Sequence, residues 1–227
     1  EEKGIEVLAN KFKTTISMDN ITLEDGVVIK NKLFSILADK ANYNNANKTI
    51  VLEGNIRLSN RIGDIGDINT LKNIKDIQNS DVNKTDKEMS GTFEKVYFNL
   101  DERNLYATDG FDLKYDEVGL KGKNIVLNEI SQSFKVTDDV KFTYQDYIFD
   151  VNYIEKEPNS DIINVYGQIK GGNPIYSVLA DKGEYNINDK KIRVFGNVDI
   201  TSTKGENLKL DNFIYSSETK EMDMYGN

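Results

Sequence analysis

The sequence predicts an all-β protein of about fourteen short antiparallel strands, built from seven repeats of 29 residues. Three observations predict this fold class: a fixed repeat period, an alternation of apolar and polar residues within each repeat, and turn-forming residues between the alternating segments. Because the repeat runs almost from end to end, we expect residues 1–227 to form a single elongated domain.

The repeat is anchored on a column that contains only glycine and aspartate. Neighbouring anchors lie 29 residues apart, except for one gap that is 26 residues longer and a last step of 30. Apolar residues recur four and two positions before each anchor, and again two positions after it. The anchors are Asp25, Gly54, Asp109, Asp138, Gly167, Gly196 and Gly226.

Each repeat reads as two half-buried strands joined by a turn. In the segment 50–58 the even positions are apolar or glycine and the odd ones mostly polar, which is typical of a strand with one buried face. An upstream strand carries apolar columns with one step of three, as in Ile36, Ala38, Ala41 and Tyr43, which predicts a β-bulge. Between the strands lie polar turn formers at 44–47, 157–160 and 186–189.

The anchor column is expected to lie on the inward face and to mark a bend in the strand. Glycine inside a strand is typical of a bulge or of a close approach between backbones. Asp25, Asp109 and Asp138 are then expected to bond to backbone donors or water. The alternative is a ligand site in which these carboxylates gather around an ion.

An insertion of 26 residues at about 60–90 separates the second and third repeats. Its isoleucine spacing suggests a short amphipathic helix at about 70–77, flanked by polar residues. Two interpretations stay open: a tolerated surface insertion, or a partner contact or flap.

Composition argues against catalysis and against nucleic-acid binding. The chain has no histidine and no cysteine, so the commonest general base and the thiol nucleophile are absent. A net charge of −9 disfavours nucleic acid, and no stretch is long and apolar enough for a transmembrane helix. We therefore predict a binding or structural protein with no catalytic residue, no metal and no cofactor.

Two repeats carry a resemblance to a known family. The segments LADKANY (37–43) and IVLEGNIRL (50–58), with LADKGEY (179–185) and IRVFGNVDI (192–200), resemble the repeat of the LptA/LptC/OstA-like family. Weaker copies extend the similarity over the chain apart from the insertion, although aspartate replaces the anchor glycine three times. The resemblance implies an elongated open β-jellyroll, a folded trough of antiparallel strands.

The family's function is also implied by this resemblance. Its members are non-enzymatic periplasmic proteins that pass lipopolysaccharide from an inner-membrane ABC transporter towards the outer membrane, with the acyl chains shielded inside the trough. In this chain lipopolysaccharide or a related glycolipid would contact the inward apolar columns of the middle repeats. These residues are Phe111, Leu113, Ile125, Leu127, Phe134, Val136, Val140, Phe142, Ile163 and Val165.

Partners are expected at the ends of the strand array. The last repeat stops at Gly226 and Asn227, so either the chain is a fragment or its final strand is an open edge. In the family such edges join homologous transport-bridge proteins, and the ABC transporter is a further expected partner. We expect a periplasmic location, either freely soluble or anchored to the inner membrane in a longer chain.

Two other function classes remain open from the sequence. The first is a structural or surface β-repeat protein whose apolar columns pack into a closed core and bind no lipid. The second is a glycan-acting enzyme with an exposed acidic cleft.

Overall fold

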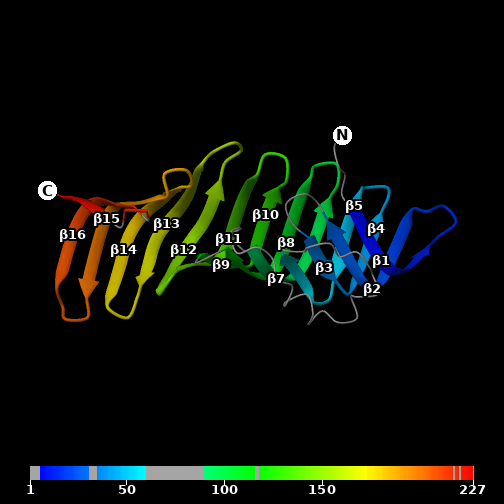
Figure 1. The fold of residues 1–227 in the computed structure, drawn as a ribbon, viewed down its shortest axis with the longest axis horizontal. Coiled ribbons are helices and arrows are strands. Elements are labelled where there is room, and N and C mark those ends of the chain that lie inside the picture. Colours follow the sequence, from blue (N-terminus) through cyan, green and yellow to red (C-terminus); the bar gives the residue numbers. More distant parts are fainter. Residues whose placement is uncertain are drawn as a thin grey trace. The chain divides into compact units, whose positions relative to one another are not determined.

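A computed structural model of the chain describes residues 6–30, 35–59, 89–115, 118–216, 218–219 and 221–226. Within these ranges the regular structure consists of seventeen β-strands without a helix, and the strand pairs are antiparallel (Figure 1). The all-β antiparallel prediction is therefore confirmed. The chain divides into two compact units, residues 1–116 and residues 117–227. The prediction of one domain over residues 1–227 stays a prediction.

Unit 1 is a ladder in which each hairpin pairs with the next. Strand β2 pairs with β1, β3 and β4. Strand β3 then pairs with β6, and β4 pairs with β5. Strands β5 and β6 both pair with β7, and β7 pairs with β8. Its strands are β1 (Glu6–Thr14), β2 (Asn20–Lys30), β3 (Ser35–Ala38), β4 (Lys40–Asn44), β5 (Thr49–Glu53), β6 (Ile56–Ser59), β7 (Met89–Asn99) and β8 (Asn104–Tyr115).

Unit 2 is a meander in which consecutive strands pair from β10 to β17, and β9 pairs with β11. Figure 1 shows its long strands side by side. Its strands are β9 (Val118–Gly122), β10 (Asn124–Asn128), β11 (Ser133–Tyr144), β12 (Tyr147–Lys156), β13 (Ile162–Gly172), β14 (Tyr176–Asn186), β15 (Lys191–Ser202), β16 (Asn207–Ser216) and β17 (Met222–Tyr225).

The strand count agrees with the repeat. Three strands are interrupted by one or two residues, between β3 and β4, between β5 and β6, and between β9 and β10. When each interrupted strand is counted once, the described residues contain the predicted fourteen strands. The predicted insertion at about 60–90 and its helix at 70–77 lie outside the described residues, except that Met89 and Ser90 begin β7.

Four hairpins share one turn, in which an asparagine side chain replaces a backbone acceptor. The Oδ1 atom of Asn44 accepts the N–H groups of Ala46 and Asn47 at 2.9 and 3.2 Å. The fourth residue after the asparagine is left-handed, as in Lys48 with φ 51°. The same turn follows Asn99, Asn128 and Asn186. Asparagine favours this turn because its short amide reaches the backbone two and three residues on.

The anchor column marks a β-bulge in six of the seven repeats. Six anchors are left-handed, with φ between 62° and 81°. Two residues of the anchor strand face one residue of the neighbouring strand, as Gly196 and Asn197 face Asp211. The predicted bulge is confirmed, but its extra residue lies in the anchor strand and not in the upstream strand.

The anchors do not point inward as predicted, because a left-handed residue interrupts the alternation of faces. Asp25, Asp109 and Asp138 are exposed. Glycine and aspartate share the column because both tolerate the left-handed region better than most residues. Glycine is required where the facing side chain crowds the bulge: a Cβ on Gly54 would lie 2.5 Å from Oδ2 of Asp39.

Candidate functional site

The candidate site is the apolar face of unit 2, which the strand register aligns into rows. The two outer rows run across the sheet near the strand ends. One contains Leu127, Phe134, Lys156, Ile163, Tyr185, Ile192, Tyr215 and Met222. The other contains Leu120, Phe142, Phe149, Gly171, Val178, Ile200 and Leu208. Residues next to the bulges lie between these rows.

Exposure on this face increases with distance from the bulges. Beside them, Val136, Val140 and Val198 are 0%, 1% and 1% exposed. Farther along the strands, Phe134 and Phe142 are only half-buried. The side chains are therefore packed where the strands bend, and most side chains of the outer rows reach solvent, with Val178 as a buried exception at 7%.

The bends fold each half of the sheet towards the other. One layer of strands leaves both faces open to solvent unless something covers them, so a fully buried Val136 needs cover from the other half of the sheet. The side chain of Ile169, beyond the bulge of β13, lies 3.0 Å from the position that a Cβ would take on Gly183 of β14. Gly183 pairs with Val165, on the other side of that bulge. The pKa of Tyr147 is raised by its burial and then by Asp146, Tyr176 and Tyr215. Tyr147 and Tyr215 belong to opposite halves of their strands.

The face is most exposed towards the last strands of unit 2. Leu208 is 42% exposed, and Met222 and Met224 of β17 are 47% and 53% exposed. In the described part of the chain, the residue pairings of β17 are with β16 alone.

Unit 1 differs from unit 2 at the equivalent positions. Four residues before the anchors, Ile50 and Leu105 of unit 1 are 4% and 3% exposed. Phe134, Ile163 and Ile192 occupy the same column in unit 2 and are half-buried. The repeats anchored at Gly54 and Asp109 thus form a packed core, whereas Ile21 in the first repeat is half-buried like the unit 2 residues.

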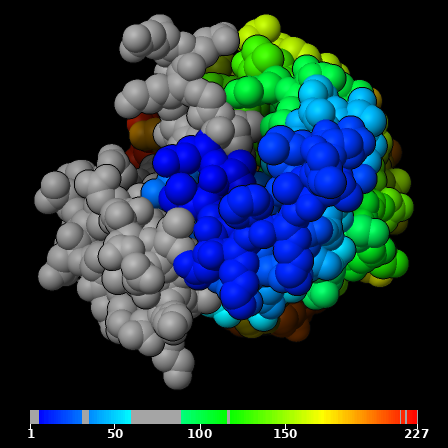
Figure 2. Space-filling model, turned by 90° about the vertical axis from the view of Figure 1, so that its right-hand side faces the viewer, coloured from blue at the N-terminus to red at the C-terminus, as the bar shows by residue number. Residues whose placement is uncertain are grey.

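The β1–β2 hairpin belongs to unit 1, and its residues are coloured dark blue to blue in Figure 2. Phe12, Ile16 and Met18 in and beside its turn are 71%, 105% and 62% exposed. This hairpin and β17 each carry several exposed apolar side chains.

The ten residues predicted to contact lipid divide into two classes. Phe111, Ile125, Val136 and Val140 are buried in the core, whereas the other six are half-buried. Phe111 belongs to unit 1, where its ring lies 6.5 Å from that of Phe93. Their contact with lipid stays a prediction, and the half-buried residues fit it best. Sequence reasoning stopped at the middle repeats and so missed later members of the outer rows, which the same columns would have found: Ile192, Ile200 and Tyr215.

Charged side chains occupy the opposite face. Lys135 Nζ lies 3.4 Å from Oε1 of Glu155 and 4.9 Å from the centre of the Tyr153 ring. Lys141 donates to Asp150 at 2.7 Å. Pairs as exposed as these contribute little to stability, but they keep charge away from the apolar face.

The anchor aspartates form no metal site. Among the described residues no group of three potential ligand side chains could hold an ion. Oδ2 of Asp138 accepts hydrogen bonds from Nδ2 of Asn124 and Oγ1 of Thr137, both at 2.8 Å, and these bonds lower its pKa, helped by Lys123. The partners are side chains, where the sequence predicted backbone donors or water.

Within the described residues, no helix is long and apolar enough to cross a membrane. No family model matches the chain, and a search of curated proteins finds no match. Among solved structures the chain is similar to LptH of Pseudomonas aeruginosa, described as the LptA homologous periplasmic component of the conserved lipopolysaccharide transport device. The identity is 9% and the TM-score 0.43, over 60% of this chain and 84% of LptH.

Proposed function

We propose that this protein is a non-enzymatic periplasmic carrier of lipopolysaccharide or a related glycolipid. The observation that carries the proposal is the gradient of exposure on the apolar face of unit 2. Side chains next to the bulges hold the fold together, whereas Phe134, Phe142 and Ile163 farther out remain half-buried and available to acyl chains. The repeat's resemblance to the LptA/LptC/OstA-like family supports the same proposal.

The chemistry of such a carrier needs no catalytic group. Burial of an acyl chain is worth about 0.8 kcal/mol per CH₂, so ten buried methylenes contribute roughly 8 kcal/mol before the cost of ordering the chain. The outer rows of unit 2 contain aliphatic and aromatic side chains, with Lys156 as their charged member. Nζ of Lys156 donates to the carbonyl of Gln132 at 3.0 Å.

The proposed role includes transfer between proteins. The exposed methionines of β17 and the exposed apolar residues of the β1–β2 hairpin offer surfaces for homologous transport-bridge proteins and for an inner-membrane ABC transporter. Lipid would then move from the transporter towards the outer membrane along apolar faces that adjoin one another.

The structural alternative is a closed β-repeat protein that binds no lipid. The packed core of unit 1 favours it, because Ile50 and Leu105 are buried where the corresponding residues of unit 2 are not. The two functions predict different results when a reactive probe is placed on the half-buried face.

The test is photo-crosslinking in a cell that produces lipopolysaccharide. A photoreactive amino acid is placed at Phe134 or at Phe142, and at the exposed Lys135 or Lys141 as matched neighbours on the opposite face. We expect a glycolipid adduct at the two phenylalanines and none at the two lysines. A folded protein without an adduct at either phenylalanine would favour the closed structural protein.

A further inference from the structure

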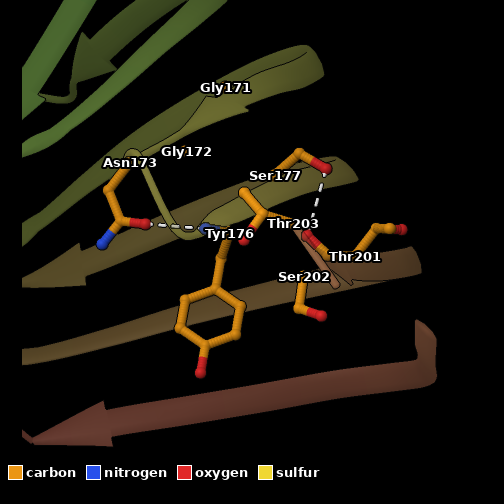
Figure 3. Close-up of a pocket in the computed structure, with 8 residues that line it drawn as sticks. All are labelled: Gly171, Gly172, Asn173, Tyr176, Ser177, Thr201, Ser202 and Thr203. Atoms are coloured by element: carbon orange, nitrogen blue, oxygen red, sulfur yellow. Dashed lines mark hydrogen bonds between the residues drawn. The ribbon is translucent and has the colours of Figure 1, made fainter. Parts of the chain in front are cut away.

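An open pocket of about 390 Å³ lies at one end of the strands of unit 2. Its volume falls within the range of about 300–1,000 Å³ of small-ligand sites. It is formed where β13, β14 and β15 end and by the short connections that follow them. Its lining residues are all uncharged: Gly171, Gly172, Asn173, Tyr176, Ser177, Thr201, Ser202 and Thr203 (Figure 3).

The backbone of the pocket is held by its own hydrogen bonds. Oδ1 of Asn173 accepts the N–H groups of Ile175 and Tyr176 at 3.0 and 2.8 Å, and its Nδ2 donates to Asp146 at 3.2 Å. The N–H of Thr203 donates to the carbonyl of Ile175 at 2.9 Å, which ties the β15–β16 connection to the β13–β14 turn. The site is therefore ordered before a ligand arrives.

Two glycines leave the end of β13 bare on both faces of the sheet. Successive strand residues point to opposite faces, so Gly171 and Gly172 together omit one side chain on each. A Cβ on Gly172, with φ 150°, would lie 1.9 Å from the carbonyl oxygen of Tyr176. The close approach of the two strands thus requires glycine at 172 and keeps this part of the pocket free of side chains.

The neighbouring strands place an aromatic ring and hydroxyl groups at this end. Figure 3 shows the Tyr176 ring on one side of β14 and the Ser177 hydroxyl on the other. Among the described residues, no hydrogen-bond partner is found for the hydroxyls of Tyr176 and Thr203, and Ser177 donates over a long 3.4 Å to Thr201. These hydroxyls can turn to a ligand without breaking a strong bond.

This set of groups suits one class of ligand. A phosphate is bound by arginine, lysine or converging backbone N–H groups, and a metal ion by carboxylates, none of which line the pocket. Neutral hydroxyl and amide groups match the hydroxyls of a sugar. The face of a tyrosine ring is electronegative and attracts the weakly positive C–H groups of a sugar ring.

The pocket also adjoins the apolar face. Tyr176 and Ser202 pair at the strand ends. The next pair on the same face of the sheet is Val178 with Ile200, and both belong to an outer row of the candidate site. On the neighbouring strand β12, the ring of Tyr147 stacks on that of Phe149 with the ring centres 6.0 Å apart. An amphiphile whose acyl chains lie on this face would therefore place part of its saccharide at the pocket.

We propose that the pocket at the ends of β13, β14 and β15 is a saccharide subsite that binds the uncharged sugars of the carried glycolipid. Tyr176 supplies the aromatic platform, and Ser177 and Thr203 supply the hydrogen-bonding hydroxyls, whereas the Thr201 hydroxyl is held by Asp199 and Asn207. That the sugar belongs to a glycolipid carried by this protein rests on the proposed function. That the pocket binds a sugar does not.

The test uses sugar and acyl probes separately. Isotopically labelled protein is titrated with deacylated lipopolysaccharide core oligosaccharide, with inorganic phosphate, and with the fluorescent fatty acid cis-parinaric acid. We expect the oligosaccharide to shift the backbone amide signals of residues 171–177 and 201–203, and phosphate to shift none of them. Tyr176→Ala should weaken oligosaccharide binding by about five- to tenfold, the loss of one aromatic contact.

Two further variants keep the test specific. Tyr225→Ala removes another exposed tyrosine of unit 2 outside the pocket and should leave oligosaccharide binding unchanged. Thr203→Val keeps the shape of the side chain and removes its hydroxyl, so it should weaken binding by a smaller factor. Parinaric acid should bind wild type and Tyr176→Ala equally.

The outcomes separate this inference from the proposed function. Binding of parinaric acid without any response to the oligosaccharide would overturn the saccharide subsite and leave the carrier intact. A response to phosphate at the same amides would likewise overturn it. A response to the oligosaccharide without parinaric acid binding would support the subsite and contradict the carrier.

Discussion

The bulge at Gly54 offers a direct test of how the repeat is built. Gly54→Ala adds a Cβ to a residue with φ 74°, and left-handed backbone costs a residue other than glycine about 1–2 kcal/mol. The new methyl group would also lie 2.5 Å from Oδ2 of Asp39. Asp39 must then move and lose its hydrogen bond from Nδ2 of Asn55, now 2.7 Å long, at about 0.5–1.5 kcal/mol.

The expected total is a loss of about 1.5–3.5 kcal/mol in the free energy of unfolding. For a chain of this size that lowers Tm by roughly 3–14 °C. Urea unfolding followed by far-ultraviolet circular dichroism measures the change through the midpoint, provided that the slope m is unchanged.

A double-mutant cycle separates backbone strain from the clash. In an Asp39→Ala background the clash is absent, so Gly54→Ala should cost only the backbone term of about 1–2 kcal/mol. An equal cost in both backgrounds would show that Asp39 does not crowd the bulge. A cost below about 0.5 kcal/mol in wild type would refute the left-handed bulge itself.

Three other perturbations test the core, the titration of a bulge and the last strand. Ile154→Ala, at a side chain only 2% exposed, should lower the free energy of unfolding in urea by about 2–5 kcal/mol. Ile148→Ala, at a side chain 53% exposed, should change this free energy by less than about 0.5 kcal/mol. Equal effects of the two substitutions would contradict the assignment of the packed face. The folded-state pKa of Asp138 is lowered, so its charge stabilises the fold above the unfolded pKa of about 3.9, and this contribution is lost as pH falls through the folded pKa. Asp138→Asn should therefore show a smaller loss of Tm between pH 7 and pH 3 than wild type. An unchanged loss would argue against a stabilising role of this carboxylate. Replacing Met222 and Met224 by lysine should lower self-association or binding to a homologous partner in analytical ultracentrifugation without changing the fold, and unaltered association would exclude this strand from the contact.

The regular features of the fold followed from local chemistry. Period-two alternation, as in 50–58, predicts a strand because it reflects which face of a single strand is buried. Asparagine at 44 and 186 predicts the turns because its amide bonds to the backbone only two and three residues away. These interactions lie within one repeat, so the sequence of that repeat contains the information.

The geometry of the anchor column could be predicted only in part. The restriction to glycine and aspartate was a signal for left-handed backbone, which sequence reasoning interpreted as an inward bend instead. Whether an anchor must be glycine depends on the facing strand: Asp39 and Asp181 crowd Gly54 and Gly196, with side-chain oxygens 2.5 and 2.7 Å from the added Cβ. That contact joins residues about fifteen positions apart.

The sequence by itself determined the repeat, the strand type, the turns and the set of apolar columns. It assigned the same column to Leu105 and Phe134, and both lie on the apolar face. Only the tertiary structure decided that Leu105 is 3% exposed and packed in a core while Phe134 is half-buried. The physical reason is that burial depends on how closely the two halves of a folded sheet approach, which is set by bulges and neighbouring strands together and not by the alternation within one strand.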